Sequence, residues 1–342
     1  MTIDIFGTHA LTRAVNDLAS DVSTFLLDRY FPMAQTEQSE EIHFDVRKGK
    51  KRIAPIVSPK VEGKVVEQLG YESRTFRPAY LKPKAQFDPD KPFRRVAGEP
   101  IGGTLSPMER RAANVRDTLE DHAEMVMRRL EVMASEILRT GQVTVSGEGF
   151  DDRVVDFLRD NSLTITLSGT DLWSDAGSDN QKVGNLETWA GLVQNLAGVT
   201  IVDVVMDPDA WAEFRQDPEV KELLDTRRGS ESELELGPNS ELVSRKGELG
   251  QFVIWTYNDT YIDDAGVEQN LMPSGTVIGA SRQIEGTRHF GAIKDEANTF
   301  EAVDIFSKSW VEEDPGHRWV LTQSAPLVVP YRPDASFAAT VL

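Results

Sequence analysis

The sequence predicts an α+β fold organised around one long helix. Across residues 106–141, apolar residues recur every three or four positions, an average of about 3.6, which is the period of an α-helix. Short β-forming runs bounded by prolines precede this stretch. From residue 185 onward, strand-like and capped helical segments are mixed. Together these patterns indicate helical and strand regions within one α+β chain.

The long helix has clear boundary signals at both ends. Ser106 and Glu109 form the two halves of a capping box. Gly141 provides the left-handed stop. At a rise of about 1.5 Å per residue, a helix over 107–140 is roughly 50 Å long, whereas globular helices average about 11–12 residues. We therefore expect this helix to act as a spine.

A basic, proline-rich segment precedes the helix. Residues 45–96 contain 14 Lys/Arg and 6 Asp/Glu, whereas the other 290 residues carry a net charge of −27. Residues 42–100 hold 7 of the 17 prolines, which bound or interrupt β-forming runs at 53–57, 64–69 and 75–81. Because proline removes a ladder hydrogen-bond donor, such strands are confined to edges or two-stranded ribbons. We expect a long hairpin that needs another surface to stabilise it.

The remaining elements follow from local patterns. Before and just after the spine, we expect a terminal helix ending near Tyr30, and strands at 143–145 and 163–167 separated by a short helix within 147–161. A domain boundary within 169–184 should be followed by a helix that Gly198 closes, a strand at 199–206, helices that start at Pro208 and Pro218, and a loop at 224–240. The remaining chain should form strands at 251–257, 276–280 and 288–293, a hairpin around 258–266, and a long strand at 319–329. The apolar stripe of the spine should bury against the strands within 143–167 and 319–329, not against a partner helix.

Composition and motifs argue against an enzyme. The chain has no cysteine, and its five histidines are not arranged at metal-ligand spacings. His122, on the spine, is therefore expected to be structural. G-x-S-x-G, Walker A and H-E-x-x-H motifs are absent, and acidic clusters at 263–264 and 312–314 are expected by chance among 56 acidic residues. We predict no catalytic residue, metal or cofactor.

Targeting signals are also absent from the sequence. No apolar run approaches the ~20 residues that a membrane-spanning helix needs. The N-terminal residues lack the basic region, apolar block and cleavage site of a signal peptide.

The charge distribution leaves several interpretations open. A net charge of −19 argues against tight binding to a nucleic-acid backbone. The basic segment could contact the acidic surface of another copy, which we favour, form a solvated face, or bind nucleic acid through residues 45–96. Arg227 and Arg228, followed by several glutamates, suit either an intersubunit contact or weak local ion pairs. A carboxylate-dependent hydrolase ranks last, and would need paired carboxylates in one deep pocket.

Six stretches resemble the lambda-like major capsid (head) proteins of tailed bacteriophages, in the order of that family. They are V-S-P-x-V-x-G-x-V (57–65), F-x-P-x-Y-x-K-P-K (76–84), G-E-x-F-D (147–151), D-P-x-x-W-x-x-F-R (207–215), L-D-T-R-R-G-S-x-S-E-L-E (224–235) and Q-S-A-P-L (323–327). The stretch at 224–235, with one free position, is the most specific.

The resemblance implies an α+β fold of the Hong Kong 97 capsid type. The expected division is an N-terminal arm at 1–41, an extended hairpin called the E-loop at 42–104, a peripheral domain at 105–182 with the spine at 107–140, an axial domain at 183–310, and a return strand with the C-terminal segment at 311–342. The E-loop of that fold reaches over a neighbouring subunit.

The resemblance also implies a structural protein that assembles in the host cytoplasm and resides in the virion. Hexamers and pentamers would form an icosahedral shell around double-stranded DNA, without sequence-specific binding. Implied partners are a scaffolding protein, a portal, a maturation protease and a decoration protein. The expected intersubunit contact residues are Arg74, Arg77, Tyr80, Lys82, Lys84, Arg94, Arg95, Arg227 and Arg228.

Overall fold

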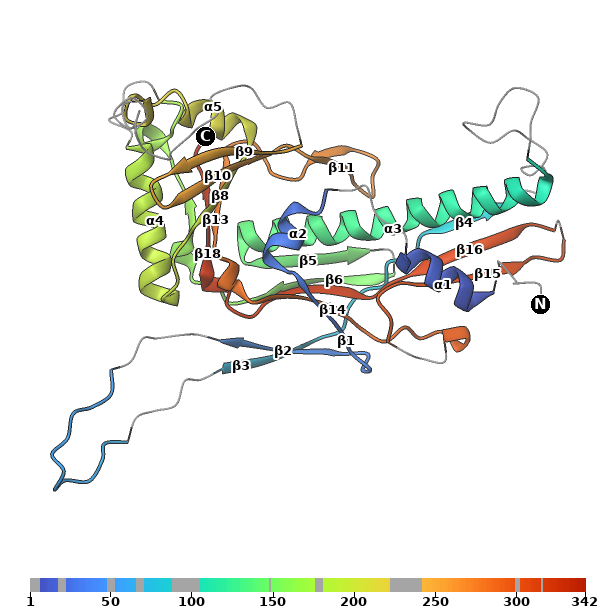
Figure 1. The fold of residues 1–342 in the computed structure, drawn as a ribbon, viewed down its shortest axis with the longest axis horizontal. Coiled ribbons are helices and arrows are strands. Elements are labelled where there is room, and N and C mark those ends of the chain that lie inside the picture. The colour runs from blue at the N-terminus through green and yellow to red at the C-terminus, as the bar shows by residue number, and fades with distance from the viewer. Residues whose placement is uncertain are drawn as a thin grey trace.

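A spine helix, a sheet across one end of it and a projecting ribbon make up the molecule, seen in a computed structural model (Figure 1). The structure describes residues 7–17, 23–47, 53–65, 71–87, 105–147, 149–175, 181–221, 242–298, 302–314 and 316–342. The predicted loop at 224–240 lies outside the described residues. None of the described helices is both long enough and apolar enough to cross a membrane.

Helix α3 (Pro107–Thr140) is the predicted spine, and its boundaries are confirmed. The Ser106 hydroxyl accepts the N–H of Glu109 at 3.3 Å, and the Glu109 carboxylate accepts the N–H of Ser106 at 2.7 Å. Gly141 has φ +74°, the left-handed conformation that ends the helix, and its N–H donates to the Ile137 carbonyl at 2.8 Å. Local sequence signals therefore suffice to place this helix.

Strands and helices both cover the apolar stripe of α3. Strands β5 (Gln142–Gly147) and β17 (Pro326–Pro330) pack against it, as predicted. Helices α1 (Thr8–Asp17) and α2 (Phe25–Tyr30) pack against it too, so the expectation that only strands bury the stripe is wrong. The N-terminal segment also forms two helices rather than the single one expected. Residues 23–24 are not helical, and both helices bury apolar side chains in the same core.

A six-stranded mixed sheet stands across one end of α3 (Figure 1). In spatial order its strands are β7 (Thr164–Thr166), β18 (Ser336–Thr340), β13 (Thr276–Ala280), β8 (Asp203–Met206), β10 (Phe252–Tyr257) and β9 (Val243–Leu249). Helix α4 (Lys182–Ala197) runs beside this sheet, on the side away from α3, and α5 (Pro208–Phe214) lies near its upper end (Figure 1).

Aromatic side chains fill the core between α4 and this sheet. The Trp189 and Phe337 ring centroids are 5.6 Å apart, and Trp173 stacks on Trp189 at 6.3 Å. The predicted end of α4 is confirmed, because Gly198 has φ +72°. The predicted start of α5 is confirmed too, because the Asp207 carboxylate accepts N–H groups of its first turn.

Smaller sheets and ribbons complete the architecture. They are β1 (Met33–Thr36) with β14 (Gly286–Phe290) and β17; β15 (Phe306–Val311) with β16 (Arg318–Gln323) and β4 (Lys84–Phe87); β2 (Ile42–Arg47) with β3 (Tyr71–Phe76); β5 with β6 (Phe150–Asp156); and β11 (Thr260–Ile262) with β12 (Glu268–Asn270). Short 3-10 turns occupy Asn161–Leu163, Gly169–Asp171, Arg282–Ile284, Glu296–Asn298 and Pro333–Ala335.

The short helix expected within 147–161 is wrong. Residues 150–156 form strand β6, antiparallel to β5. Val154 is exposed on this strand, whereas Val155 and the following Phe157 are buried. The pairing with β5 therefore overrides a local pattern that fits a helix.

The long strand expected at 319–329 is also wrong. The chain divides at Ser324 into β16 and β17, which belong to different sheets. Ser324 forms an isolated bridge with Leu81, with N···O distances of 2.8 and 3.1 Å. The chain changes sheets there, just before Pro326.

The C-terminal segment belongs to the six-stranded sheet. Strand β18 lies between β7 and β13, pairing parallel with the first and antiparallel with the second. The expected division places residues 311–342 in a segment separate from 183–310. Strand β18 of this segment pairs directly with β13, which lies within 183–310.

The β-forming runs expected at 53–57 and 64–69 do not form strands where the structure describes them. The described chain is irregular over 53–65, and residues 66–69 lie outside the described residues.

Candidate assembly surfaces

The ribbon β2–β3 and the segment 53–65 form a projecting arm (Figure 1). The ribbon is antiparallel, pairs Ile42 with Phe76, and buries both side chains. Beyond it, Ile53, Ile56 and Val65 are 93%, 99% and 98% exposed. Exposed apolar side chains on a projecting segment are typical of a surface that a partner covers.

The base of the arm is fixed to the body by polar contacts. Glu40 forms ion pairs with Arg77 and with Lys294, the latter at 2.5 Å, and these cations, Lys294 foremost, lower the pKa of the Glu40 carboxyl. The Tyr80 hydroxyl donates to the Ala292 carbonyl at 3.0 Å and accepts the N–H of Lys294 at 3.2 Å. These contacts set the direction in which the arm leaves the body.

The predicted contact residues that the structure describes have partners within their own chain. Arg74 pairs with Glu72 at 2.8 Å, and the Lys82 ammonium lies 4.8 Å from the centre of the Tyr80 ring. The Lys84 ammonium lies 3.7 Å from the ring centre of Trp319 and 5.2 Å from that of Trp310. Arg77, Tyr80 and Lys82 thus lie together at the base of the arm, whereas Lys84 lies against strands β15 and β16. Arg94, Arg95, Arg227 and Arg228 lie outside the described residues.

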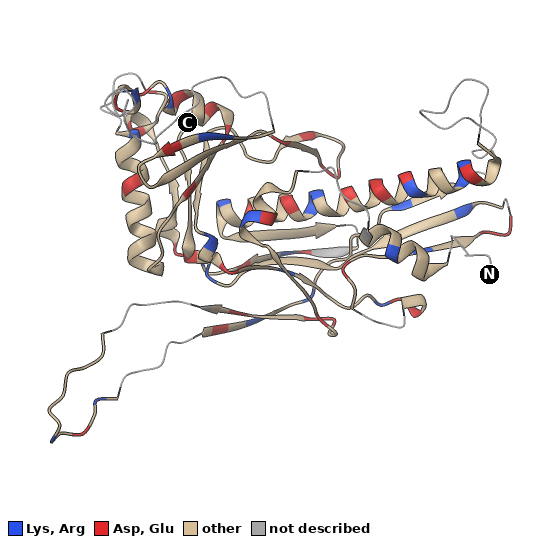
Figure 2. Ribbon diagram, in the orientation of Figure 1, with Lys and Arg blue, Asp and Glu red and all other residues tan. Residues whose placement is uncertain are grey.

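The outward face of α3 is charged but mixed in sign. Acidic and basic residues are both present along α3 (Figure 2), and Arg116 pairs with Glu120 one turn later at 2.8 Å. Such exposed pairs contribute only about 0–1 kcal/mol each. The face suits many weak contacts with a neighbour better than one strong site.

His122 has a structural role, as predicted. It is buried on α3, and its Nδ1 lies 3.0 Å from the Thr322 hydroxyl on β16. Burial lowers the pKa of its imidazole. The neutral side chain therefore links the helix to the sheet.

Two buried polar anchors were missed by the sequence prediction. Glu131 on α3 accepts hydrogen bonds from the start of α2, and Asp203 on β8 pairs with Arg29 of α2. The available signal for Glu131 was an acidic residue among apolar neighbours, in LEVMA at 130–134. Such a residue is buried only with partners.

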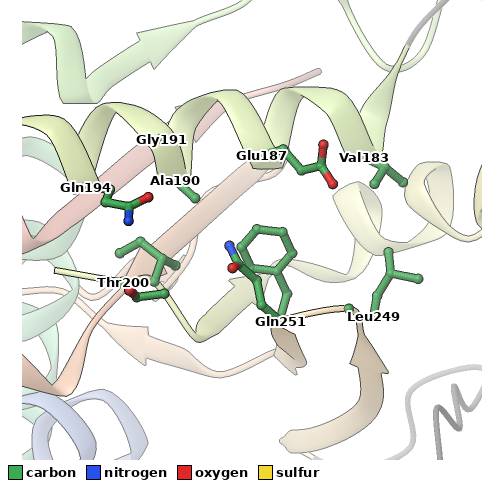
Figure 3. Close-up of a pocket in the computed structure, with 11 residues that line it drawn as sticks. Val183, Glu187, Ala190, Gly191, Gln194, Thr200, Leu249 and Gln251 are labelled. Carbon is green, nitrogen blue, oxygen red and sulfur yellow. The ribbon is translucent and has the colours of Figure 1, made fainter.

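A pocket of about 380 Å³ lies between α4 and the turn that joins β9 to β10 (Figure 3). Glu187 is the only carboxylate among its lining residues, so the pocket lacks the pair that the hydrolase interpretation requires. Across the described ranges, no group of three or more His, Asp or Glu side chains is placed to hold a metal ion.

Comparison with known proteins identifies the family. Residues 7–341 match the profile of the family described as phage major capsid protein E. The chain belongs to this family. The major capsid protein of Escherichia phage lambda is 32% identical over 334 residues, covering 96% of each chain. That of Enterobacteria phage P21 is 31% identical over 315 residues, covering 90% of this chain and 91% of the relative.

The fold of this capsid protein agrees with the same family. A solved structure of a putative prophage capsid protein from E. coli CFT073 has a TM-score of 0.76 at 22% identity, covering 98% of this chain and 99% of that one. The capsid structure of cyanophage P-SCSP1u gives 0.52 at 9% identity, covering 95% and 90%. The predicted α+β, Hong Kong 97-type capsid fold is confirmed.

Family membership also settles the class of function. The relatives are structural major capsid proteins of phage virions, which confirms the predictions of a structural role, a capsid location and no enzymatic activity. The comparisons favour this interpretation over the alternative of a nucleic-acid-binding protein that uses residues 45–96.

Proposed function

We propose that this chain assembles into hexamers and pentamers that close into an icosahedral shell around packaged double-stranded DNA. The observation that supports this most is the projecting arm, whose tip exposes Ile53, Ile56 and Val65 almost completely. A folded subunit gains by covering such side chains, at about 25 cal/mol per Å² of apolar surface. A neighbouring copy provides the covering surface.

The anchored base of the arm supports the same proposal. Because Glu40, Arg77, Lys294 and Tyr80 hold the base, the arm leaves each subunit in a defined direction. A defined direction lowers the conformational entropy that is lost when the arm binds a neighbour. The charged residues Arg74, Lys82, Lys84, Arg94, Arg95, Arg227 and Arg228 would then add intersubunit ion pairs to an acidic neighbour.

The domain division and the other partners belong to this proposal. The N-terminal arm (1–41), E-loop (42–104), peripheral domain (105–182), axial domain (183–310) and return segment (311–342) would each make different contacts in the shell. A scaffolding protein, a portal, a maturation protease and a decoration protein would act on it during head assembly in the host cytoplasm.

Substitution at the arm tip tests the proposal. Ile56→Ser should leave a folded subunit but abolish shells and capsomer rings in electron micrographs, because it removes apolar surface that only a neighbour covers. Ile262→Ser is the matched control, since Ile262 is 73% exposed on β11, away from the arm. Shell formation by the Ile56 variant at the wild-type level would refute the role of the tip.

A charge-reversal experiment tests the electrostatic part separately. Arg94→Glu combined with Arg95→Glu should weaken assembly without unfolding the subunit, and high salt should slow assembly of the wild-type protein. If the double variant assembles normally, the arm does not act through these charges.

A further inference from the structure

A buried carboxylate holds the N-terminal helix α2 against the spine. Glu131, on α3, is 1% exposed. Its Oε1 accepts the N–H of Leu26 at 2.8 Å, and its Oε2 accepts the N–H of Leu27 at 2.9 Å. These N–H groups lie in the first turn of α2, where the helix itself supplies no acceptor. Glu131 therefore replaces a local N-cap with an anchor 105 residues further along the chain.

Tyr257, on β10, completes this site. Its hydroxyl lies 2.9 Å from Glu131 Oε1 and 3.4 Å from the carbonyl oxygen of Ser23, which precedes α2. A phenol has one proton to donate. The hydroxyl can therefore donate to Glu131 or to Ser23, and the protonation state of Glu131 decides between them.

We propose that Glu131, Tyr257 and Ser23 form a proton-dependent latch on the N-terminal segment 23–31. When Glu131 is ionised, the Tyr257 hydroxyl donates to the carboxylate. When Glu131 takes up one proton from solvent, its own O–H donates to the Tyr257 oxygen, and the Tyr257 hydroxyl turns to the Ser23 carbonyl. The neutral state thus adds a bond to the segment and removes a buried charge.

The direction of the pH dependence follows from burial. Burial raises the pKa of Glu131 to about 7 from its ordinary 4.5, against the N–H groups of Leu26 and Leu27 and the Tyr257 hydroxyl, which favour ionisation. In the undocked state Glu131 meets water and regains its ordinary pKa. Docking is therefore strongest at acid pH, weakens as pH rises from about 4.5, and levels off above about 7. Linkage between these two values lowers the docking constant by up to about 70-fold between about pH 5 and pH 8.

The other charged groups around the latch have partners of their own. On α2, Asp28 pairs with Arg288 at 2.5 Å, and Arg29 pairs with Asp203. The charge of Asp28 also helps to raise the pKa of Glu131. On the β10 side, burial together with the charges of Glu131 and Asp259 raises the pKa of Tyr257, so the phenol keeps its proton. Glu131 is thus the group of this site whose charge changes near neutral pH.

Amide hydrogen exchange of the full-length protein tests the latch. The measured quantity is the protection factor of the peptide that contains Leu26 and Leu27, which divides out the intrinsic pH dependence of exchange. In the wild-type protein this factor should fall at least tenfold from pH 5 to pH 8, declining steadily from pH 5 and levelling off above about 7. In Glu131→Gln it should stay constant, because glutamine does not ionise. Glu124→Gln changes a half-buried carboxylate two turns earlier on α3 and should behave as the wild type.

A second variant separates the effect of the hydrogen bond from Tyr257 to Ser23 from the effect of the buried charge on Glu131. Tyr257→Phe removes the hydroxyl that connects neutral Glu131 to Ser23, so it should lower protection at pH 5 toward the wild-type value at pH 8. If wild-type protection is the same at both pH values, the proposal is wrong, even where Glu131→Gln fails to fold. An equal fall in wild type and Glu131→Gln would likewise overturn it, because another group would then be titrating.

Discussion

Replacing Arg159 by methionine should destabilise the end of the spine helix. Arg159 is 7% exposed, and its guanidinium donates to the carbonyls of Leu138 and Arg139, each at 2.6 Å. It also donates to the Thr164 hydroxyl at 2.6 Å. The two carbonyls belong to the last turn of α3, where the helix supplies no donor. The guanidinium therefore caps α3 and opposes the negative end of its dipole.

The size of the effect follows from these contacts. Methionine is similar in length but donates no hydrogen bond, and each buried carbonyl left unsatisfied costs about 1–3 kcal/mol. Loss of the cation at the helix end adds up to about 2 kcal/mol. Burial lowers the pKa of Arg159 to about 10, and methionine relieves the desolvation that causes this shift. We expect the free energy of unfolding to fall by about 2–4 kcal/mol in total.

Urea unfolding at neutral pH, followed by circular dichroism, measures this change. Arg245→Met is the matched control, because Arg245 is half exposed on β9 and pairs only with Glu248 at the surface among the contacts described. The control should lose less than about 1 kcal/mol. If Arg159→Met loses no more than Arg245→Met, the guanidinium does not cap α3 in the way its distances indicate.

Three other substitutions test separate features by thermal unfolding. Gly279→Ala should prevent normal folding, because the new methyl group would lie 2.0 Å from the Phe337 ring; normal unfolding would contradict the close approach of β13 and β18. Ser106→Ala should cost about 1 kcal/mol through loss of the cap on α3, and no change would show that the cap is not formed. Asp207→Asn should keep the cap on α5 while abolishing pH dependence near pH 6. Burial raises the pKa of Asp207 to about 6, so the stability it contributes is present at acid pH and is lost as pH rises through 6; an unchanged pH profile would refute this.

The sequence predicts the spine well because the signals for it are local. Ser106, Glu109 and Gly141 act within a few residues of the helix ends, so no distant contact is needed to place them. The same holds for Gly198 and Asp207. Predictions made from local patterns failed where contacts outside the run itself decide the outcome. The run at 150–156 fits a helical spacing, yet it pairs with β5 and becomes a strand.

The assembly surface was predicted only in outline, for the same reason. Prolines and β-forming runs indicated a projecting hairpin, and the ribbon β2–β3 confirms it. Its anchorage depends on Lys294 and Ala292, which lie more than two hundred residues from Tyr80 and have no local signal. Glu131 escaped prediction in the same way, since its partners at the start of α2 lie 105 and 104 residues away.

The position of strand β18 has a consequence for synthesis of the chain. Residues 336–340 emerge from the ribosome after every other strand of the six-stranded sheet, yet β18 lies between β7 and β13. Until it inserts, β13 has an open edge that can pair with another chain, and β7 has no neighbour in the sheet. A chain truncated before β18 therefore lacks a finished sheet and is prone to aggregate.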